Sequence, residues 1–172
     1  MYKALLGPEA AVYGDHVELS QMVREGGQWK EIGQDFASTL GTGGIPGTKF
    51  TWPDYGSKFQ SVYLDRQKES HWKKWLGLYH ARMLSRGTFR NLYLTGYDVP
   101  EGYLIEKDGK MYYAFFAPEK VWKGELELRG LVPGRHRVWD YVNEKELGTV
   151  ESLNPHLTAE FNEYLLLQVS RQ

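Results

Sequence analysis

The stretch DFASTLGTGGIPGTKF, from Asp35 to Phe50, joins a short apolar run to a segment rich in glycine. A Walker loop that cradles phosphate needs a glycine, four further residues and then Gly-Lys-Ser/Thr. Here Gly47 is followed by Thr48 before the lysine, and the residue five positions before Gly47 is Thr42 rather than glycine. The segment therefore lacks the spacing of a Walker loop.

The dinucleotide-binding fingerprint G-x-G-x-x-G also fails in this segment. Gly41 and Gly43 fit its first two glycines, but Pro46 stands where the third glycine belongs. Both nucleotide motifs need a helix directly after the loop, because the N–H groups of its first turn hold the anion. The next residues, TKFTWPDYGS at 48–57, are aromatic and broken by proline. Two interpretations stay open: a turn without a ligand, and a loop at the carboxyl end of a barrel strand.

Length and composition indicate a protein with a real core and a nearly neutral surface. The 172 residues suffice for one domain or two small ones, and 41% of them are hydrophobic. A net charge of -1 argues against a nucleic-acid partner, because such binding needs a basic face. No apolar run approaches the roughly 20 residues of a membrane span. The absence of cysteine excludes disulfides and thiolate chemistry, which suits a cytoplasmic protein.

The first half of the chain mixes helical and strand signals. YKALLG at 2–7 is typical of a helix end, with Gly7 as its stop. Two short apolar runs, AAVYG at 10–14 and DFASTLG at 35–41, predict buried strands. Between them, EGGQWKEIGQ at 25–34 has room for only a turn or two of helix.

The clearest single element is a helix within KESHWKKWLGLYHARMLSRG at 68–87. Its large apolar residues recur at helical spacing and predict one buried face, while most of its basic residues face outward. Ser70 is the expected N-cap, and Gly87 lies just past the expected end. The residues of the predicted buried face are Trp72, Trp75, Leu76, Tyr79 and Met83.

After about residue 95 the pattern changes to short strands separated by turns. YLIEKDGKMYYAFFA at 103–117 predicts two strands joined at Asp108-Gly109, a strong hairpin signal. GELELRG at 124–130 alternates strictly and should point its leucines inward. Further strands are expected at 134–142, 145–151 and 163–169, with turns at Pro133-Gly134, Asn143-Glu144 and Asn154-Pro155. Antiparallel strands at this spacing predict a small β-sandwich.

Several of these strings together resemble one enzyme family. VYGDHVEL at 12–19, DFASTLGTGGIPGTKFTWP at 35–53, the tryptophan-rich helix and EGYLIEKDGKMYYAFFA at 101–117 carry the resemblance. They look like the carboxyl-terminal part of alpha-galactosidase-like glycoside hydrolases, of the family 36 and clan D type. The resemblance covers nearly the whole chain and rests on the order of the strings rather than on one diagnostic motif.

The resemblance implies an α/β plus all-β fold class: the last βα units of a (β/α)8 barrel followed by a small antiparallel β-sandwich. Residues 1–95 would be the barrel segment and residues 96–172 the sandwich domain. Residues 10–16 resemble barrel strand seven with its loop, 35–41 strand eight, and 66–86 the last barrel helix. The glycine-rich segment would then follow strand eight at the mouth of the barrel, where active sites of such barrels lie.

The family's two catalytic aspartates are expected upstream of this chain. The resemblance implies an aspartate nucleophile after strand four and an acid/base aspartate after strand six, and both precede Met1 in this alignment. A retaining mechanism needs two carboxyl groups about 5–5.5 Å apart, so the chain alone is expected to be inactive. In an alternative alignment LLGPEA at 5–10 forms strand six, which makes Glu9 the acid/base candidate.

The resemblance also supplies candidates for contact with a sugar. Those after the first predicted strand would bind sugar hydroxyls or merely cap a turn, and those in the glycine-rich segment would line the barrel mouth or form a plain turn. A tryptophan beyond them would stack on a sugar ring or pack against the sandwich. The histidines show no ligand spacing, so no metal is expected. The hydrolysis that the resemblance implies needs no cofactor. The substrate-binding candidates are Asp15, His16, Thr42, Gly43, Gly44 and Trp52.

The sequence thus predicts the carboxyl-terminal part of a retaining glycoside hydrolase for terminal alpha-galactosides. Its oligosaccharide substrate would bind through the parent enzyme. The alternative is a non-catalytic carbohydrate-binding or interaction module. Self-association, or pairing with the remaining barrel units, is also expected, because lone barrel strands expose edges that tend to pair.

Overall fold

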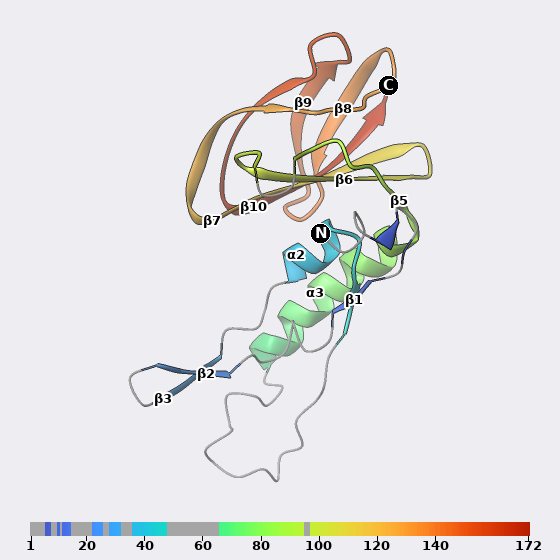
Figure 1. Cartoon of the computed structure of the whole chain (residues 1–172). Helices are drawn as coiled ribbons and strands as arrows, with labels where there is room; N and C mark the ends of the chain where they lie inside the picture. The colour runs from blue at the N-terminus through green and yellow to red at the C-terminus, as the bar shows by residue number, and fades with distance from the viewer. Residues whose placement is uncertain are drawn as a thin grey trace.

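The fold is dominated by one antiparallel sheet of six strands in the order β5-β6-β7-β10-β8-β9 (Figure 1). The computed structural model describes residues 6–7, 10, 12–14, 22–25, 28–31, 36–47, 66–94 and 97–172. The strands of the sheet are β5 Thr88–Phe89, β6 Glu101–Lys107, β7 Lys110–Glu127, β8 Arg135–Asp140, β9 Lys145–Glu151 and β10 His156–Arg171. The predicted antiparallel all-β part of the fold is therefore confirmed.

The β6–β7 hairpin turns at Asp108-Gly109, as its sequence predicts. Lys107 pairs with Lys110, and the two residues between them have φ angles of 51° and 69°. Both angles lie in the left-handed region, where Asp and Gly are tolerated better than most residues. The residues of this turn are therefore sufficient to predict the hairpin without knowledge of the rest of the chain.

Strand β7 is longer than the sequence patterns indicate. The two strings predicted as separate strands, ending at 117 and beginning at 124, belong to one strand that pairs with β10 over almost its whole length. The register jumps between Asn162, which pairs with Val121, and Glu163, which pairs with Ala117. This irregularity bends the two longest strands, which Figure 1 shows sweeping across the top of the molecule.

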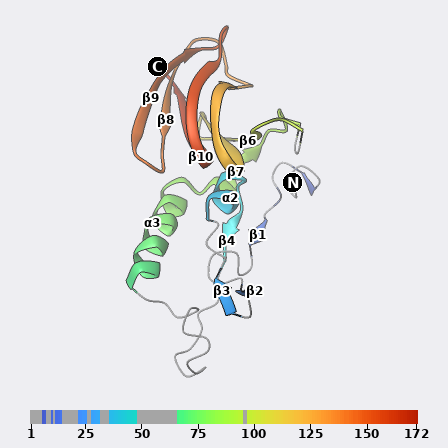
Figure 2. The ribbon, with the colours of Figure 1, turned by 90° about the vertical axis from the view of Figure 1, so that its left-hand side faces the viewer.

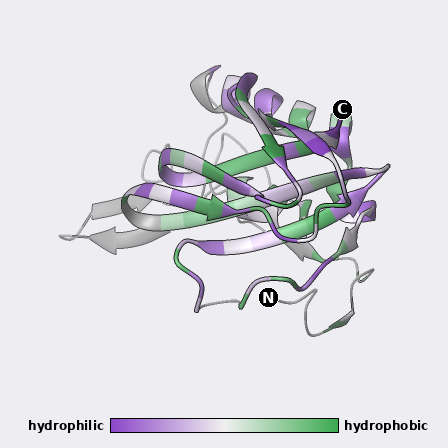
Figure 3. Ribbon diagram, turned by 90° about the horizontal axis from the view of Figure 1, so that it is seen from above, coloured by the Kyte–Doolittle hydropathy of each residue, from purple (hydrophilic) through white to green (hydrophobic). Residues whose placement is uncertain are grey.

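Alternating side chains place a different hydrophobic cluster on each face of the sheet. On β10, Leu166 faces the helices, whereas its neighbours Leu165 and Leu167 belong to the other cluster. The same alternation places Tyr112 on the helix side and Tyr113 on the opposite side. Figure 3 shows hydrophobic and hydrophilic stretches following one another along the strands. We call these the helix-side cluster and the inner cluster.

The helix-side cluster is completed by two helices that lie against the sheet, α2 Phe36–Gly41 and α3 Arg66–Arg82. The predicted buried face of α3 is confirmed at Trp72 and Trp75, which are 7% and 3% exposed. The expected N-cap is wrong, because the helix begins at Arg66, and Ser70 donates its hydroxyl to the Arg66 carbonyl at 2.9 Å. A short 3-10 helix, η3 Leu84–Arg86, follows α3.

Residues 36–41 form helix α2 and not the predicted strand. The run is only six residues long, and a short apolar run fits a buried helix as well as a strand. Phe36, Ala37 and Leu40 are all at most 3% exposed, so they bury one side of a short helix against the sheet and α3. Long-range packing decides the conformation of this segment.

A parallel pair of short strands stands apart from the large sheet. β1 Tyr13–Gly14 pairs in parallel with β4 Ile45–Pro46, so a strand at the end of AAVYG is confirmed. Between them lies a hairpin of β2 Met22–Glu25 and β3 Gln28–Glu31, where the sequence had suggested a turn or two of helix. That expectation is wrong because Gly26-Gly27, between the two strands, is a hairpin signal. Earlier in the chain Leu6 is helical and Gly7 follows with a φ angle of 113°.

Candidate functional site

The β1–α2–β4 unit defines the edge at which the predicted sugar-binding residues should gather. β1 and β4 run in the same direction, with Tyr13 beside Ile45 and Gly14 beside Pro46. The Ile45 N–H also donates to the Val12 carbonyl at 2.7 Å. The carboxyl ends of both strands therefore open on the same edge. Figure 2 shows β4 running from α2, beside the large sheet, toward the β2–β3 hairpin.

Three of the six predicted substrate-binding residues follow this edge in the sequence but lie outside the described residues. Asp15 and His16 come directly after β1, and Trp52 comes six residues after β4 ends. Glu9, the alternative acid/base candidate, precedes β1 and lies outside the described residues as well. Their roles in substrate binding and catalysis stay predictions.

The glycine-rich segment lies at the opposite end of β4 from that edge. The connection from α2 into the amino end of β4 is formed by Thr42, Gly43 and Gly44. These residues therefore follow a helix and not the strand that the family resemblance had implied. The error comes from reading 35–41 as strand eight when that run is a helix. β4, which comes after the glycines, is the strand that pairs with β1.

Local hydrogen bonds account for the conformation of this helix-to-strand connection. The Thr42 hydroxyl donates to the Ser38 carbonyl at 2.7 Å, which holds the last turn of α2. The Gly44 N–H donates to the Thr39 carbonyl at 2.7 Å, and Gly43 has a φ angle of 74° that favours glycine. Gly43 and Gly44 are buried. These contacts are those of a tight helix end.

Gly41, which the sequence analysis considered only as part of the dinucleotide-binding fingerprint, permits a close approach between α2 and the large sheet. A Cβ atom on Gly41 would lie 2.7 Å from the Ala114 Cβ and 2.9 Å from Leu166 Cδ2. Both distances are shorter than real Cβ contacts, so any side chain here would push the helix away from β7 and β10. The glycine thus fixes the position of the β1–α2–β4 unit relative to the sheet.

An aromatic cluster holds the other end of α2, the end on the side of the strand carboxyl termini. The Phe36 ring stacks on Trp75 with ring centres 5.9 Å apart and meets Trp72 edge-on at 5.3 Å. His71 packs edge-on against Phe36 at 5.5 Å, and Tyr164 of β10 meets Trp75 at 5.8 Å. Such pairs add to the free energy gained from burial, so they stabilise the packing of the two helices against each other and against β10.

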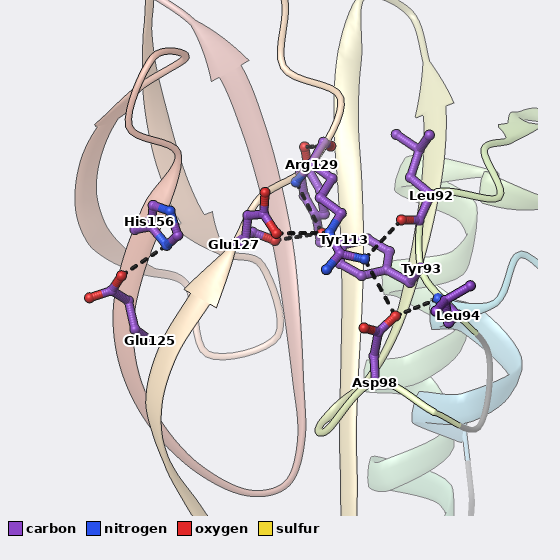
Figure 4. Close-up of polar contacts among 9 residues, drawn as sticks. All are labelled: Leu92, Tyr93, Leu94, Asp98, Tyr113, Glu125, Glu127, Arg129 and His156. Atoms are coloured by element: carbon purple, nitrogen blue, oxygen red, sulfur yellow. Dashed lines mark hydrogen bonds and ion pairs between the residues drawn. The ribbon is translucent and has the colours of Figure 1, made fainter.

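A polar network at the start of the large sheet has the chemistry of a structural tie. Tyr93 donates its hydroxyl to the Glu127 carbonyl at 2.8 Å and accepts the Arg129 N–H at 3.1 Å, as Figure 4 shows. The Arg129 guanidinium pairs with Glu127 at 2.9 Å and Asp98 at 3.4 Å and lies 4.9 Å above the Tyr93 ring. Tyr113 donates to the Arg129 carbonyl at 2.7 Å. We call these five residues the Arg129 network.

Burial raises the pKa of Tyr93 and of Tyr113 far above the ordinary value of a tyrosine. Both hydroxyls therefore stay protonated at neutral pH and act as hydrogen-bond donors to backbone carbonyls. They are unsuited to act as bases or nucleophiles, so the network joins the 92–98 connection to the end of β7 and does not form a reactive centre.

Within the described ranges, no group of three or more histidine, aspartate and glutamate side chains is arranged to hold a metal ion. The same ranges contain no helix that is both long and apolar enough to cross a membrane.

Comparison with known proteins relates the whole chain to sugar-cleaving enzymes. No family model matches the sequence. The chain is 30% identical over 174 residues to the A type blood alpha-D-galactosamine galactosaminidase of Flavonifractor plautii. The alignment covers 97% of this chain and 14% of that protein, so the chain spans about one seventh of the length of this relative.

Solved structures share the fold at low sequence identity. A GH27 β-L-arabinopyranosidase from Geobacillus stearothermophilus superposes with a TM-score of 0.57 and 15% identity, over 91% of this chain and 36% of that one. A putative alpha-N-acetylgalactosaminidase from Bacillus halodurans gives a TM-score of 0.55 and 10% identity, over 80% of this chain and 30% of that one. At these identities the likeness concerns the fold.

Proposed function

We propose, on the premise that this chain belongs to the alpha-galactosidase-like glycoside hydrolases, that it supplies part of a barrel active site for terminal alpha-linked galactose or galactosamine. The family relationship predicted from the sequence is confirmed by the relative from Flavonifractor plautii. The observation that carries the proposal is the 30% identity to a galactosaminidase along 97% of the chain. The aligned region includes both the β1–β4 unit and the large sheet.

The proposed assignment makes β1 the seventh and β4 the eighth strand of a (β/α)8 barrel, with α2 between them and α3 after them. Residues 1–95 would be the barrel segment and residues 96–172 the antiparallel domain. β5, at Thr88–Phe89, precedes this boundary but pairs with β6 at the edge of that domain's sheet. Parallel pairing of β1 with β4 and a helix after each strand support this assignment.

In this assignment the substrate edge comprises Asp15 and His16 after the seventh strand and the residues from Gly47 to Trp52 after the eighth. Thr42, Gly43 and Gly44 would lie at the opposite face of the barrel, where residues contribute to stability. These three residues would therefore contribute to packing and not to substrate binding.

We further propose that this chain does not hydrolyse substrate alone. The family's catalytic aspartates follow strands four and six, which would precede β1, and the mechanism needs both carboxyl groups. The chain would act together with further βα units of a barrel. In the described part of the chain, the outer edges of the β1–β4 pair carry no strand partner, and such edges support pairing with neighbouring strands.

A chimeric enzyme tests this function. The homologous segment of the Flavonifractor plautii relative is replaced by this chain, and hydrolysis of 4-nitrophenyl alpha-galactosaminide and alpha-galactoside is measured beside the 172-residue chain alone. We expect turnover by the chimera and none by the isolated chain. Turnover by the isolated chain would refute the need for further barrel units, and a folded but inactive chimera would favour a non-catalytic module.

Two substitutions in the chimera test the assigned edge. Asp15→Ala should lower kcat/KM by about tenfold or more, because a lost charged hydrogen bond costs about 1.5–3 kcal/mol. Thr42→Ala, at the opposite end of β4, should leave kcat/KM within about twofold. The reverse pattern would show that the strand assignment is wrong.

A further inference from the structure

We propose that the free edge of β10 between Thr158 and Glu163 is a docking site for an extended, basic segment of a partner protein, which adds as a strand beside it. This interaction is separate from the proposed hydrolase function and does not depend on it.

For much of its length, strand β10 is paired with another strand along just one of its two edges. Its first edge pairs with β7 from His156 to Val169. Its second edge pairs with β8 from Leu167 to Arg171, and the Leu166 carbonyl accepts one more N–H, from Tyr141, at 3.2 Å. Between Thr158 and Glu163, no strand among the described residues continues this second edge.

An open edge of this kind presents unused backbone groups. In an antiparallel strand, successive residues direct their N–H and C=O groups alternately to the two edges. Up to the register jump between Asn162 and Glu163, the groups of residues 158–162 that face away from β7 are therefore available as donors and acceptors. Binding of an extended peptide by strand addition uses such groups for affinity and side-chain contacts for specificity.

The second edge forms one wall of a groove, which restricts what can occupy it. The facing wall comes from the end of β8, the following turn and the start of β9, through Asp140, Asn143, Lys145 and Leu147. A single added strand needs about 4.7–4.9 Å beside its neighbour and can lie along the groove. If two copies of the protein paired through this edge of β10, the β8–β9 turn of each copy would occupy the space needed by the other. Edge-to-edge pairing of two copies is therefore obstructed.

The charge of the groove favours a basic occupant. Its lining includes three carboxylates, Asp140, Glu160 and Glu163, and one ammonium group, Lys145. With Lys123, which pairs with Glu160, 2 − 3 gives a net charge of -1, and Asp140 is buried. Backbone N–H groups at 3.0 and 3.1 Å hold the Asp140 carboxylate, and Lys123 pairs with Glu160 at 2.9 Å. Glu163 is exposed and makes no ion pair with another described residue. A lysine or arginine of the added strand would pair with it.

Nuclear magnetic resonance of the 15N-labelled chain tests this proposal. The probe is an octapeptide of alternating lysine and valine. We expect it to shift the amide resonances of residues 158–163 and to slow the hydrogen exchange of the outward-facing amides at least tenfold. The matched control is the same peptide with alternate backbone nitrogens methylated, which removes the donors of one edge and should abolish the shifts.

Two charge substitutions separate the groove from general electrostatic attraction. Glu163→Lys should weaken peptide binding at least tenfold. Glu163 and Asp108 are both exposed acidic residues with positive φ angles, of 63° and 51°. Asp108→Lys, in the β6–β7 turn, makes the same change of charge and should change binding less than twofold. The amide spectra of both variants report whether the fold is kept.

Three results would overturn the proposal. The first is equal binding of the methylated peptide, which would mean that side chains alone hold it. The second is slow exchange of these amides in the peptide-free chain, which would mean that the edge is already covered. The third is protection that appears only as the protein concentration rises and sedimentation shows dimers, which would make a second copy the occupant.

Discussion

At the scale of single residues, two helical glycines meet opposite surroundings. Gly41 ends α2 where a Cβ atom would collide with Ala114 and Leu166 of the sheet. Gly77 lies in the middle of α3, and a Cβ atom there would have nothing within 4 Å. The first glycine is required by packing, whereas the second only loosens the helix.

These surroundings predict opposite effects of alanine. Gly41→Ala should lower the free energy of unfolding by about 1–3 kcal/mol, because it overpacks the contact with the sheet. Gly77→Ala should raise it by up to about 1 kcal/mol, because alanine favours helix and meets no obstacle. Urea denaturation of the two variants measures both changes, and equal effects would contradict the described contact at Gly41.

The Tyr93 hydroxyl should contribute measurably to stability. Tyr93→Phe leaves the Glu127 carbonyl and the Arg129 N–H without their partner, which should cost about 1–3 kcal/mol. Tyr97→Phe is the control, since Tyr97 is 85% exposed, and it should change stability by less than about 0.5 kcal/mol. Thermal and urea unfolding report both values, and a neutral Tyr93→Phe would argue against the Arg129 network as a tie.

Sequence reasoning succeeded where the deciding residues are neighbours in the chain. The Asp108-Gly109 turn was predicted because its two residues alone favour the left-handed conformation. Gly41 could not be assigned a role, since the atoms it approaches belong to Ala114 and Leu166, far away in the sequence. For the candidate site, the position of Asp15 directly after a strand was foreseen, while its role stays a prediction.

At the scale of elements, α2 shows how a short apolar run can be misread. Six residues give too few turns for helical periodicity to appear, so the run fitted a strand equally well. The mistake displaced the eighth strand by one element and put the glycine-rich connection at the wrong end of it. α3, with 17 residues and a repeated aromatic face, left no such ambiguity.

Packing of α2 against α3 predicts a large effect of a single truncation. Phe36 is fully buried between Trp72 and Trp75, so Phe36→Ala should cost about 3–5 kcal/mol through the cavity it leaves. Phe36→Leu fills part of that space and should cost less. Urea unfolding gives the stabilities, and near-ultraviolet circular dichroism follows the tryptophans. Equal stability of the alanine variant and the parent would rule out the described packing.

At the scale of the whole molecule, buried tyrosines link stability to alkaline pH. Burial raises the pKa of Tyr93, Tyr103, Tyr113 and Tyr141 above 10.0, and for Tyr103 a hydrogen bond to Glu101 adds to the effect. Because the folded pKa is the higher one, their contribution to stability is complete below about pH 10. It is lost as the pH rises further and the unfolded chain releases protons.

The free energy of unfolding should therefore fall between about pH 9 and pH 11, by more than exposed tyrosines would cause. Urea denaturation at both values measures the change, and absorbance at 295 nm follows tyrosinate formation. Ionisation of all twelve tyrosines near pH 10 in the folded protein would contradict the described burial.

The helix-side cluster has a consequence for how this chain exchanges parts with other proteins. Its members come from α2, α3 and the large sheet, including Phe36, Trp75 and Leu166. A recombination breakpoint placed just before the sheet would leave Tyr103, Ile105 and Leu166 without their cover. When gene segments recombine, in nature or by design, residues 36 to 172 should therefore be exchanged together. Chimeric proteins joined near residue 95 should be recovered mostly as insoluble product.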